Sequence, residues 1–219
     1  MVKGKRKDRI QRLRCQEGKG YYRQENCCDI CFNTSIKCTQ TKGKAVINWT
    51  KQSNVSKVDA YVTYCGTKYP TTPITTKKNA VTITKINGKK LDQTKDFKIY
   101  LVGYDSSGKK VGNTITAHFV GKDNKNYTNV KSFTLNKSEV TIKKGKSTTL
   151  RKATIKPEDS KKKQISDSHA AELRFKTTNP KIAKVDKNGK ITGVAAGSCT
   201  VYAYARNGLS SKVKVTVTK

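Results

Sequence analysis

The stretch TTNPKIAKVDKNGKITGVAAGSCTVYAYA, Thr177–Ala205, decides how the chain folds, because its apolar and polar residues alternate almost without a break. Near its end, one set of side chains falls on one face (Cys199, Val201, Ala203 and Ala205) and another set on the opposite face (Thr200, Tyr202 and Tyr204). A helix would scatter both sets around its axis, whereas successive side chains of a β-strand point to opposite faces. The pattern therefore predicts a strand with one buried face.

The pair Asn188-Gly189 lies inside this stretch, between IAKVD and KITGV. Asn-Gly between two alternating segments favours a β-hairpin with a type I′ turn, since both central residues of that turn need a positive φ. The hairpin also accounts for the DxNG sequence at Asp186–Gly189, which lacks the remaining acidic positions of a calcium-binding loop.

Short strands with turns between them continue on both sides of this stretch. Val213, Val215 and Val217 share a face, and Val140 and Ile142 precede a turn at Gly145 and a strand around Leu150. This pattern is typical of a small β-sandwich, which we expect to span residues 131–219. The segment KPEDSKKKQISDSHAAELRF breaks the pattern. We expect a surface insertion there, with a short helix that Ser166 or Asp167 caps and that ends at Leu173.

Residues 41–121 have the same character. Three sets of apolar residues each share one face of a strand (Ala45, Ile47 and Trp49; Phe97, Ile99 and Leu101; Ile115, Ala117 and Phe119). Turn signals fall between them at Asn87-Gly88 and at Asp105–Gly108. The sequence therefore predicts an all-β protein with two tandem sandwiches, 41–121 and 131–219, joined by a linker at 122–130.

Residues 1–40 differ in composition, with five cysteines and no alternating segment (Cys15, Cys27, Cys28, Cys31 and Cys38). Their basic start is not followed by the apolar run of an export signal. Cys15, Cys28, Cys31 and Cys38 could supply four thiolates to zinc, and disulfides are the alternative in an exported protein. A second CxxC or a paired His is missing, so we favour neither. The prediction is an irregular, disordered basic leader, either a false gene start or a frame-shifted remnant.

The formal net charge is +32, and the lysines are spread along the whole chain. Beyond residue 40 the arginines are Arg151, Arg174 and Arg206, although specific recognition of phosphates or bases favours arginine. We therefore expect a solvated lysine coat. The alternative is contact with a polyanion through the densest basic runs (Lys143, Lys144, Lys146, Lys161, Lys162 and Lys163), with Tyr202 and Tyr204 exposed beside them to stack on sugar rings or bases.

The sequence predicts no catalytic residues, no cofactor and, apart from the cysteines of the leader, no metal ligands. His118 and His169 lie in different predicted sandwiches, and we interpret each as an isolated surface histidine. Cys65 and Cys199 are also in different sandwiches, so we expect no disulfide between them, and we place Cys199 in the core as a small hydrophobe. No stretch approaches the ~20 apolar residues that a membrane helix needs.

Residues 131–219 resemble a bacterial immunoglobulin-like domain of group 2. The resemblance rests on LNKSEVTIKKGKSTTL (Leu135–Leu150), FKTTNPKIAKVDKNGKITGVAAGSCTVYAYA (Phe175–Ala205) and VKVTVT (Val213–Thr218). The chain departs from the family at Phe175, where a tryptophan is usual, and in a longer insertion at 158–173.

Residues 41–121 resemble a fibronectin type III module more weakly, on GKAVINW (Gly43–Trp49), the strand around Tyr61 and DFKIYLVGYDSSGKKVGNTITAHF (Asp96–Phe119). Together the two resemblances imply part of a larger modular protein that is secreted or on the cell surface, as in Gram-positive bacteria. Modules of these families have no catalytic residues that could be transferred to this chain.

Three functions remain as alternatives. The favoured one is a non-enzymatic surface module that serves as a spacer or stalk, or as an adhesive module that contacts cell-wall polymers, carbohydrate or host surface molecules. The second is a pair of accessory, non-catalytic modules of a larger surface enzyme. The third is a basic nucleic-acid-binding protein that gains affinity by counterion release. The third is disfavoured because most of the arginines lie in the leader.

Overall fold

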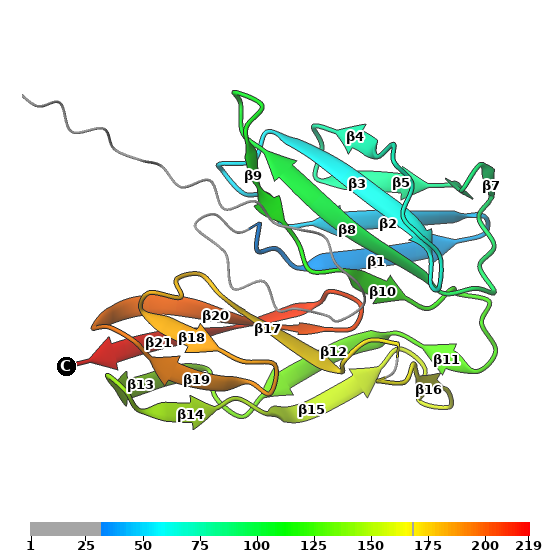
Figure 1. Ribbon diagram of the computed structural model, residues 1–219. Coiled ribbons are helices and arrows are strands. Elements are labelled where there is room, and N and C mark those ends of the chain that lie inside the picture. The colour runs from blue at the N-terminus through cyan, green and yellow to red at the C-terminus, as the bar shows by residue number, and fades with distance from the viewer. Residues whose placement is uncertain (1–31, 168) are drawn as a thin grey trace, which may run out of the picture.

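The computed structural model describes residues 32–167 and 169–219 of the chain. This part consists of strands and turns without a helix, so it contains no helical segment that could cross a membrane. The strands form two β-sandwiches, and Figure 1 shows the first sandwich above the second. The prediction of an all-β protein with two tandem sandwiches is confirmed.

The first sandwich consists of two antiparallel sheets. One sheet has the order β1-β2-β5 (Ile36–Thr41, Lys44–Trp49 and Ala80–Ile83). The other has the order β10-β8-β3-β4, and β9 also pairs with β8 (Ala117–Phe119, Phe97–Tyr104, Lys57–Tyr64, Ile74–Thr76 and Lys110–Asn113). A small hairpin of β6 and β7 (Lys85–Ile86 and Lys89–Lys90) completes this domain. The predicted apolar faces meet between the sheets, where Ile47, Phe97 and Ile99 are fully buried. Ile115 is only half-buried.

The first sandwich begins earlier than predicted. Strand β1 pairs with β2 along its whole length, from Ile36 opposite Trp49 to Thr41 opposite Lys44. Phe32 and Ile36 are buried in the core of this domain. The expectation of an irregular leader up to residue 40 is therefore wrong for residues 32–40. The prediction missed this strand because its sequence, IKCTQT, is short and mostly polar. Such a composition suits a strand at the edge of a sheet.

The second sandwich has a sheet in the order β13-β21-β20-β17 (Glu139–Lys143, Ser210–Thr218, Gly197–Ala205 and Leu173–Thr177). A three-stranded sheet, β14-β19-β18 (Ser147–Thr149, Lys190–Gly193 and Ala183–Val185), faces it. Two further pairs are β12 with β15 (Val130–Leu135 and Lys152–Pro157) and β11 with β16 (Tyr127–Thr128 and Lys163–Gln164). Because β11 pairs within this domain, the predicted linker at 122–130 contributes a strand to the second sandwich.

The alternation in the opening stretch builds the core of the second sandwich as predicted. Val201 lies opposite Val213, and Cys199 opposite Val215, between β20 and β21. All four side chains are buried in one apolar cluster. Burial of an aliphatic side chain of this size contributes roughly 1.5–3 kcal/mol, so this strand pair is a main source of the domain's stability.

The hairpin at Asn188-Gly189 is confirmed, but its turn type is not. A type I′ turn needs a positive φ at both central residues. Gly189 has a φ of 78°, but Asn188 does not have a positive φ, since Asn87 is the only non-glycine residue with one in the described chain. The Asp186 carboxylate accepts bonds from the backbone N–H groups of Asn188 and Lys190 (2.8 and 3.0 Å), which stabilises a longer turn that closes with glycine. Asn87-Gly88, with φ values of 52° and 79°, forms the two-residue type I′ turn instead.

The insertion after β15 contains no helix in its described residues. One turn forms where the N–H groups of His169 and Ala170 bond to Ser166 O (3.1 and 3.4 Å). The insertion is also not confined to the surface, because Ile165 is buried. Both expectations for this segment are wrong, and its described residues are instead held by polar contacts to Arg206.

Candidate functional site

Two of the buried polar side chains among the described residues, Arg206 and Asn207, lie at the junction between the two sandwiches. The turn between β20 and β21, residues 206–209, lies against the first sandwich beside β1 and β10. Ile36 N–H of β1 donates to Gly208 O (3.0 Å), and His118 N–H of β10 donates to Arg206 O (2.8 Å). Each of these strands is the edge of its sheet, so the turn satisfies backbone groups that an edge leaves unpaired.

Gly208 allows this close approach. Its φ is +81°, and a Cβ atom there would lie 2.9 Å from Ala117 Cβ and 3.0 Å from Ile36 Cβ. Carbon atoms do not approach so closely without displacing one of the two strands. A glycine is therefore required both by the turn conformation and by the contact with the first sandwich.

Arg174 of β17 reaches across the junction. Its guanidinium donates to Thr116 O of the first sandwich and to Ala205 O and Arg206 O of the second (both 3.0 Å). Burial, with a contribution from the charge of Arg206, lowers the pKa of Arg174 to about 10. The side chain remains charged at neutral pH and uses its fork of donors to hold three carbonyl groups from both domains.

Arg206 ties the insertion to the same turn. Its Nε donates to Ala170 O (2.7 Å), its Nη1 donates to Gln164 Oε1 (3.2 Å), and its Nη2 forms an ion pair with Asp167. The side chain of Arg206 is only 8% exposed, whereas that of Asp167 is 77% exposed. The insertion thus packs on the junction through the only arginine–carboxylate ion pair among the described residues, in which the arginine alone is buried.

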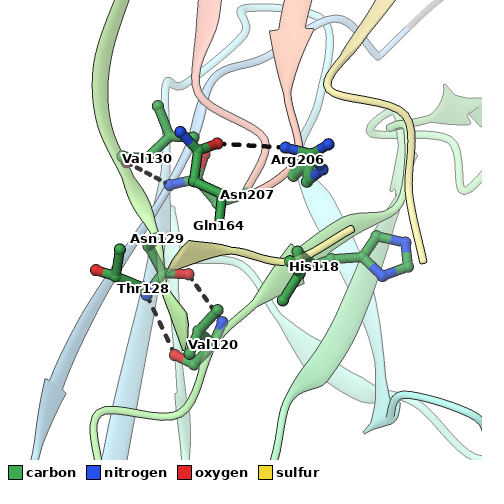
Figure 2. Close-up of a pocket in the computed structure, with 9 residues that line it drawn as sticks. His118, Val120, Thr128, Asn129, Val130, Gln164, Arg206 and Asn207 are labelled. Atoms are coloured by element: carbon green, nitrogen blue, oxygen red, sulfur yellow. Dashed lines mark hydrogen bonds between the residues drawn. The ribbon is translucent and has the colours of Figure 1, made fainter. Parts of the chain in front are cut away.

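The connection between the domains is also fixed by side-chain amides (Figure 2). Asn207 Nδ2 donates to Val130 O (2.7 Å), and Asn129 bonds to the backbone N–H and O of Val120 (2.8 and 3.2 Å). These contacts surround a small pocket, which Gln164 and Arg206 also line. The segment after β10 is therefore held at both ends rather than left as a free linker.

Tyr204, expected to be exposed, is 2% exposed at the junction. Its hydroxyl donates to Asn33 Oδ1 of the first sandwich (3.3 Å), and its ring stacks on Tyr202 at 5.8 Å. Burial raises the pKa of Tyr204 well above its usual value. The prediction of an exposed stacking platform is wrong for Tyr204, because the outer face of β20 is covered by the first sandwich.

The two histidines are not isolated, which corrects their interpretation from sequence. The rings of His118 and His169 are 5.2 Å apart and nearly perpendicular, and Cys65 Sγ is 3.7 Å from His118 Nδ1. Burial lowers the pKa of His118 to about 3 and raises the pKa of Cys65 to about 12. In Figure 2 the His118 ring points away from the bonded amides around the small pocket.

The other cysteines and the lysine runs lie elsewhere. Cys199 is buried in the second core, as expected, and Cys38 lies half-buried in β1. Cys15, Cys28 and Cys31 fall outside the described residues.

Lys143, Lys144 and Lys146 are exposed around the turn at Gly145, after β13. Lys161–Lys163 lie beside β16, at the opposite end of the second sandwich in Figure 1, so the two runs do not form one patch.

Residues 129–217 match the family model of the bacterial Ig-like domain (group 2). The second sandwich is therefore a bacterial Ig-like domain of group 2, as its motifs indicated. This match is consistent with a chain that forms part of a modular surface protein. Domains with this fold are typically non-catalytic. No curated protein matches the chain.

Several solved structures are similar to the chain. They include a C-terminal fragment of intimin in complex with the intimin-binding domain of the translocated intimin receptor (13% identity, 84% of this chain and 63% of that chain, TM-score 0.30). A second is the S-layer protein rSbsC (14% identity, 87% of this chain and 35% of that chain, TM-score 0.34). A third is the central fibronectin-III array of RIM-binding protein (14% identity, 84% of this chain and 68% of that chain, TM-score 0.30). The chain spans less than two thirds of the length of the first two structures.

The junction residues were not predicted as a site, although two signals point to them. Asn207-Gly208 is a third Asn-Gly pair between alternating segments, and it marks the turn that docks on the first sandwich. Arg174 and Arg206 are rare arginines in a region where nearly every other cation is lysine. Arginine is the preferred cation for buried contacts, so its placement among lysines indicates buried positions.

Proposed function

We propose that the chain is a non-enzymatic part of a larger modular protein, secreted or on the cell surface, and that its two sandwiches act as one rigid spacer. The junction supports this proposal. A flexible tandem would expose the polar groups of its linker, whereas here Arg174 and Gly208 bind the first sandwich directly. A rigid junction sets the direction in which the next module of a stalk projects.

The spacer is favoured over an adhesive module by the position of Tyr204. Stacking on carbohydrate needs an exposed ring, and this ring is buried against the first sandwich. A second role stays open for the exposed lysines at the turn near Gly145, which could contact anionic cell-wall polymers. Accessory modules of a larger surface enzyme would have the same fold and the same location.

Protease shaving of intact source cells, followed by blotting with an antibody against residues 131–219, tests the proposed location. We expect the epitope to be lost on shaving, and its parent band to run well above the mass of this chain. An epitope that stays protected, on a band of the mass of this chain, would refute the surface function. Binding to nucleic acid, with an affinity that falls steeply with salt, would then be measured as the alternative.

A further inference from the structure

Three metal-ligating side chains meet at the junction from three separate segments. Cys65 directly follows β3, His118 lies in β10, and His169 comes from the insertion of the second sandwich. One donor atom from each residue lies within 4.8 Å of the others. They are the only group of three such residues in the described part of the chain that could hold a metal ion.

The distances suit a tetrahedral ion. With Zn–S near 2.3 Å and Zn–N near 2.0–2.1 Å, a sulfur and a nitrogen that share one zinc are roughly 3.6 Å apart. Cys65 Sγ and His118 Nδ1 are 3.7 Å apart. The longest separation in the group, within 4.8 Å, requires a shift of about an ångström. His169 closes a single turn, where its N–H donates to Ser166 O (3.1 Å), and we expect this short turn to make the shift.

Asp96 supplies a carboxylate beside the three residues. Its backbone oxygen accepts the Cys65 N–H (2.9 Å), and its side chain accepts a bond from Asn124 Nδ2 (3.2 Å). Its charge interacts with His169. A carboxylate near a histidine ligand commonly orients its ring, a role open to Asp96 here. Lys98 and Arg174 also lie near His118, and their charges oppose a further cation.

We propose that Cys65, His118 and His169 bind one zinc ion, with a water molecule at the fourth position. A thiolate with two imidazoles suits zinc and the neighbouring borderline metals, and Cys65 releases its thiol proton to solvent on binding. The ion would connect the insertion of the second sandwich to two segments of the first. This proposal does not depend on a surface location, because it concerns only the chemistry of the junction.

Cobalt substitution on the full chain provides the test. Cys15, Cys27, Cys28 and Cys31 are first replaced by Ser in every sample, because their thiols would also bind metal. The reduced, chelator-treated protein is then titrated with Co²⁺. Binding is monitored by the thiolate-to-cobalt absorption and by the visible bands of tetrahedral cobalt, and Zn²⁺ is added last to displace the cobalt. We compare this parent with Cys65→Ser, His169→Gln and the matched control Cys38→Ser, which removes a half-buried thiol outside the site.

The expected result is one cobalt per chain with tetrahedral bands in the parent and in Cys38→Ser, displaced by zinc. Cys65→Ser should lose the thiolate band, and His169→Gln should weaken binding at least tenfold while the chain keeps its circular dichroism spectrum. Zinc should also raise the melting temperature of the parent more than that of His169→Gln. A parent that shows no thiolate band, or bands that are unchanged in His169→Gln, would overturn the proposal.

Discussion

At the scale of single residues, the two kinds of cation have different places. The lysines of the runs at 143–146 and 161–163 are mainly exposed, whereas Arg174 and Arg206 are held in the junction by backbone oxygens and Asp167. A guanidinium offers five donors in a planar fork and is less strongly hydrated than an ammonium group. The lysine charge of these two runs is therefore a property of the surface, and the junction depends on two arginines.

Gly208→Ala tests the contact between the turn and the first sandwich. The alanine would incur the cost of a positive φ and would collide with Ala117 and Ile36. Gly108→Ala is the matched control, because Gly108 has the same φ of +81° but no atom within 4 Å of the position that a Cβ would take. We expect Gly108→Ala to cost about 1–2 kcal/mol in the free energy of unfolding and Gly208→Ala clearly more. Equal losses in denaturant unfolding would contradict the close contact.

Val201→Asp tests the assignment of strand faces in β20. Val201 is 0% exposed, and an unpaired buried charge costs roughly 3–5 kcal/mol, so the second sandwich should unfold at a much lower temperature. Thr200→Asp places the same charge one residue earlier, opposite Lys214 on the other face, and should change stability little. If both variants melt like the parent in circular dichroism, the buried face of β20 is wrong.

At the scale of elements, the sequence predicted the strands with strong alternation and missed those without it. The buried faces of β8, β20 and β21 follow directly from alternating residues such as Phe97, Val201 and Val215. Strand β1 was missed because an edge strand of Thr, Gln and Lys has no such pattern. The face of Tyr204 was assigned correctly to the outside of its own sheet, but a single strand's periodicity cannot show that another domain covers that face.

The candidate site was harder to predict than the strands for the same reason. Cys65 and His118 meet within the first sandwich, His169 is added by the packing of the second domain, and the sequence spacing of the three carries no signal of either contact. The turn at Asn188-Gly189 shows that prediction from a short sequence motif is limited as well. The Asp186 carboxylate, two residues before Asn188, bonds to two backbone N–H groups and selects a different turn from the one Asn-Gly alone favours.

The turn after β13 is where we expect any contact with a polyanion. Lys143, Lys144 and Lys146 are exposed and take part in none of the ion pairs of the described residues. Lys162 instead donates to Asn124 O (2.8 Å) and lies near Asp159, so its run is partly engaged in the fold.

Replacing these three lysines by Gln should therefore lower binding to teichoic acid several-fold at low salt, with a smaller difference at high salt because exposed charges are screened. The matched triple variant at Lys161, Lys162 and Lys163 should have the smaller effect. Co-sedimentation with purified polymer at two salt concentrations measures both. A larger loss from the second variant would place the contact at the insertion instead.

At the scale of the whole molecule, the second sandwich supplies the turn that completes two edges of the first. The chain folds back so that β1 and β10 share bonds with residues 206–209, and the insertion closes over the same region (Figure 1). Inter-domain interfaces are often loose and permit relative motion by default. This junction differs because its polar groups are buried and bonded across the two domains, which is the basis of the proposed rigid spacer.

Residual dipolar couplings of backbone amides in the intact chain test that rigidity most directly. The couplings depend on how each domain is oriented in a weakly aligned sample. We predict that one alignment tensor fits the amides of both sandwiches, with the relative orientation that the junction contacts impose. Two tensors of different magnitude, one for each sandwich, would show that the domains move independently and would contradict the rigid spacer.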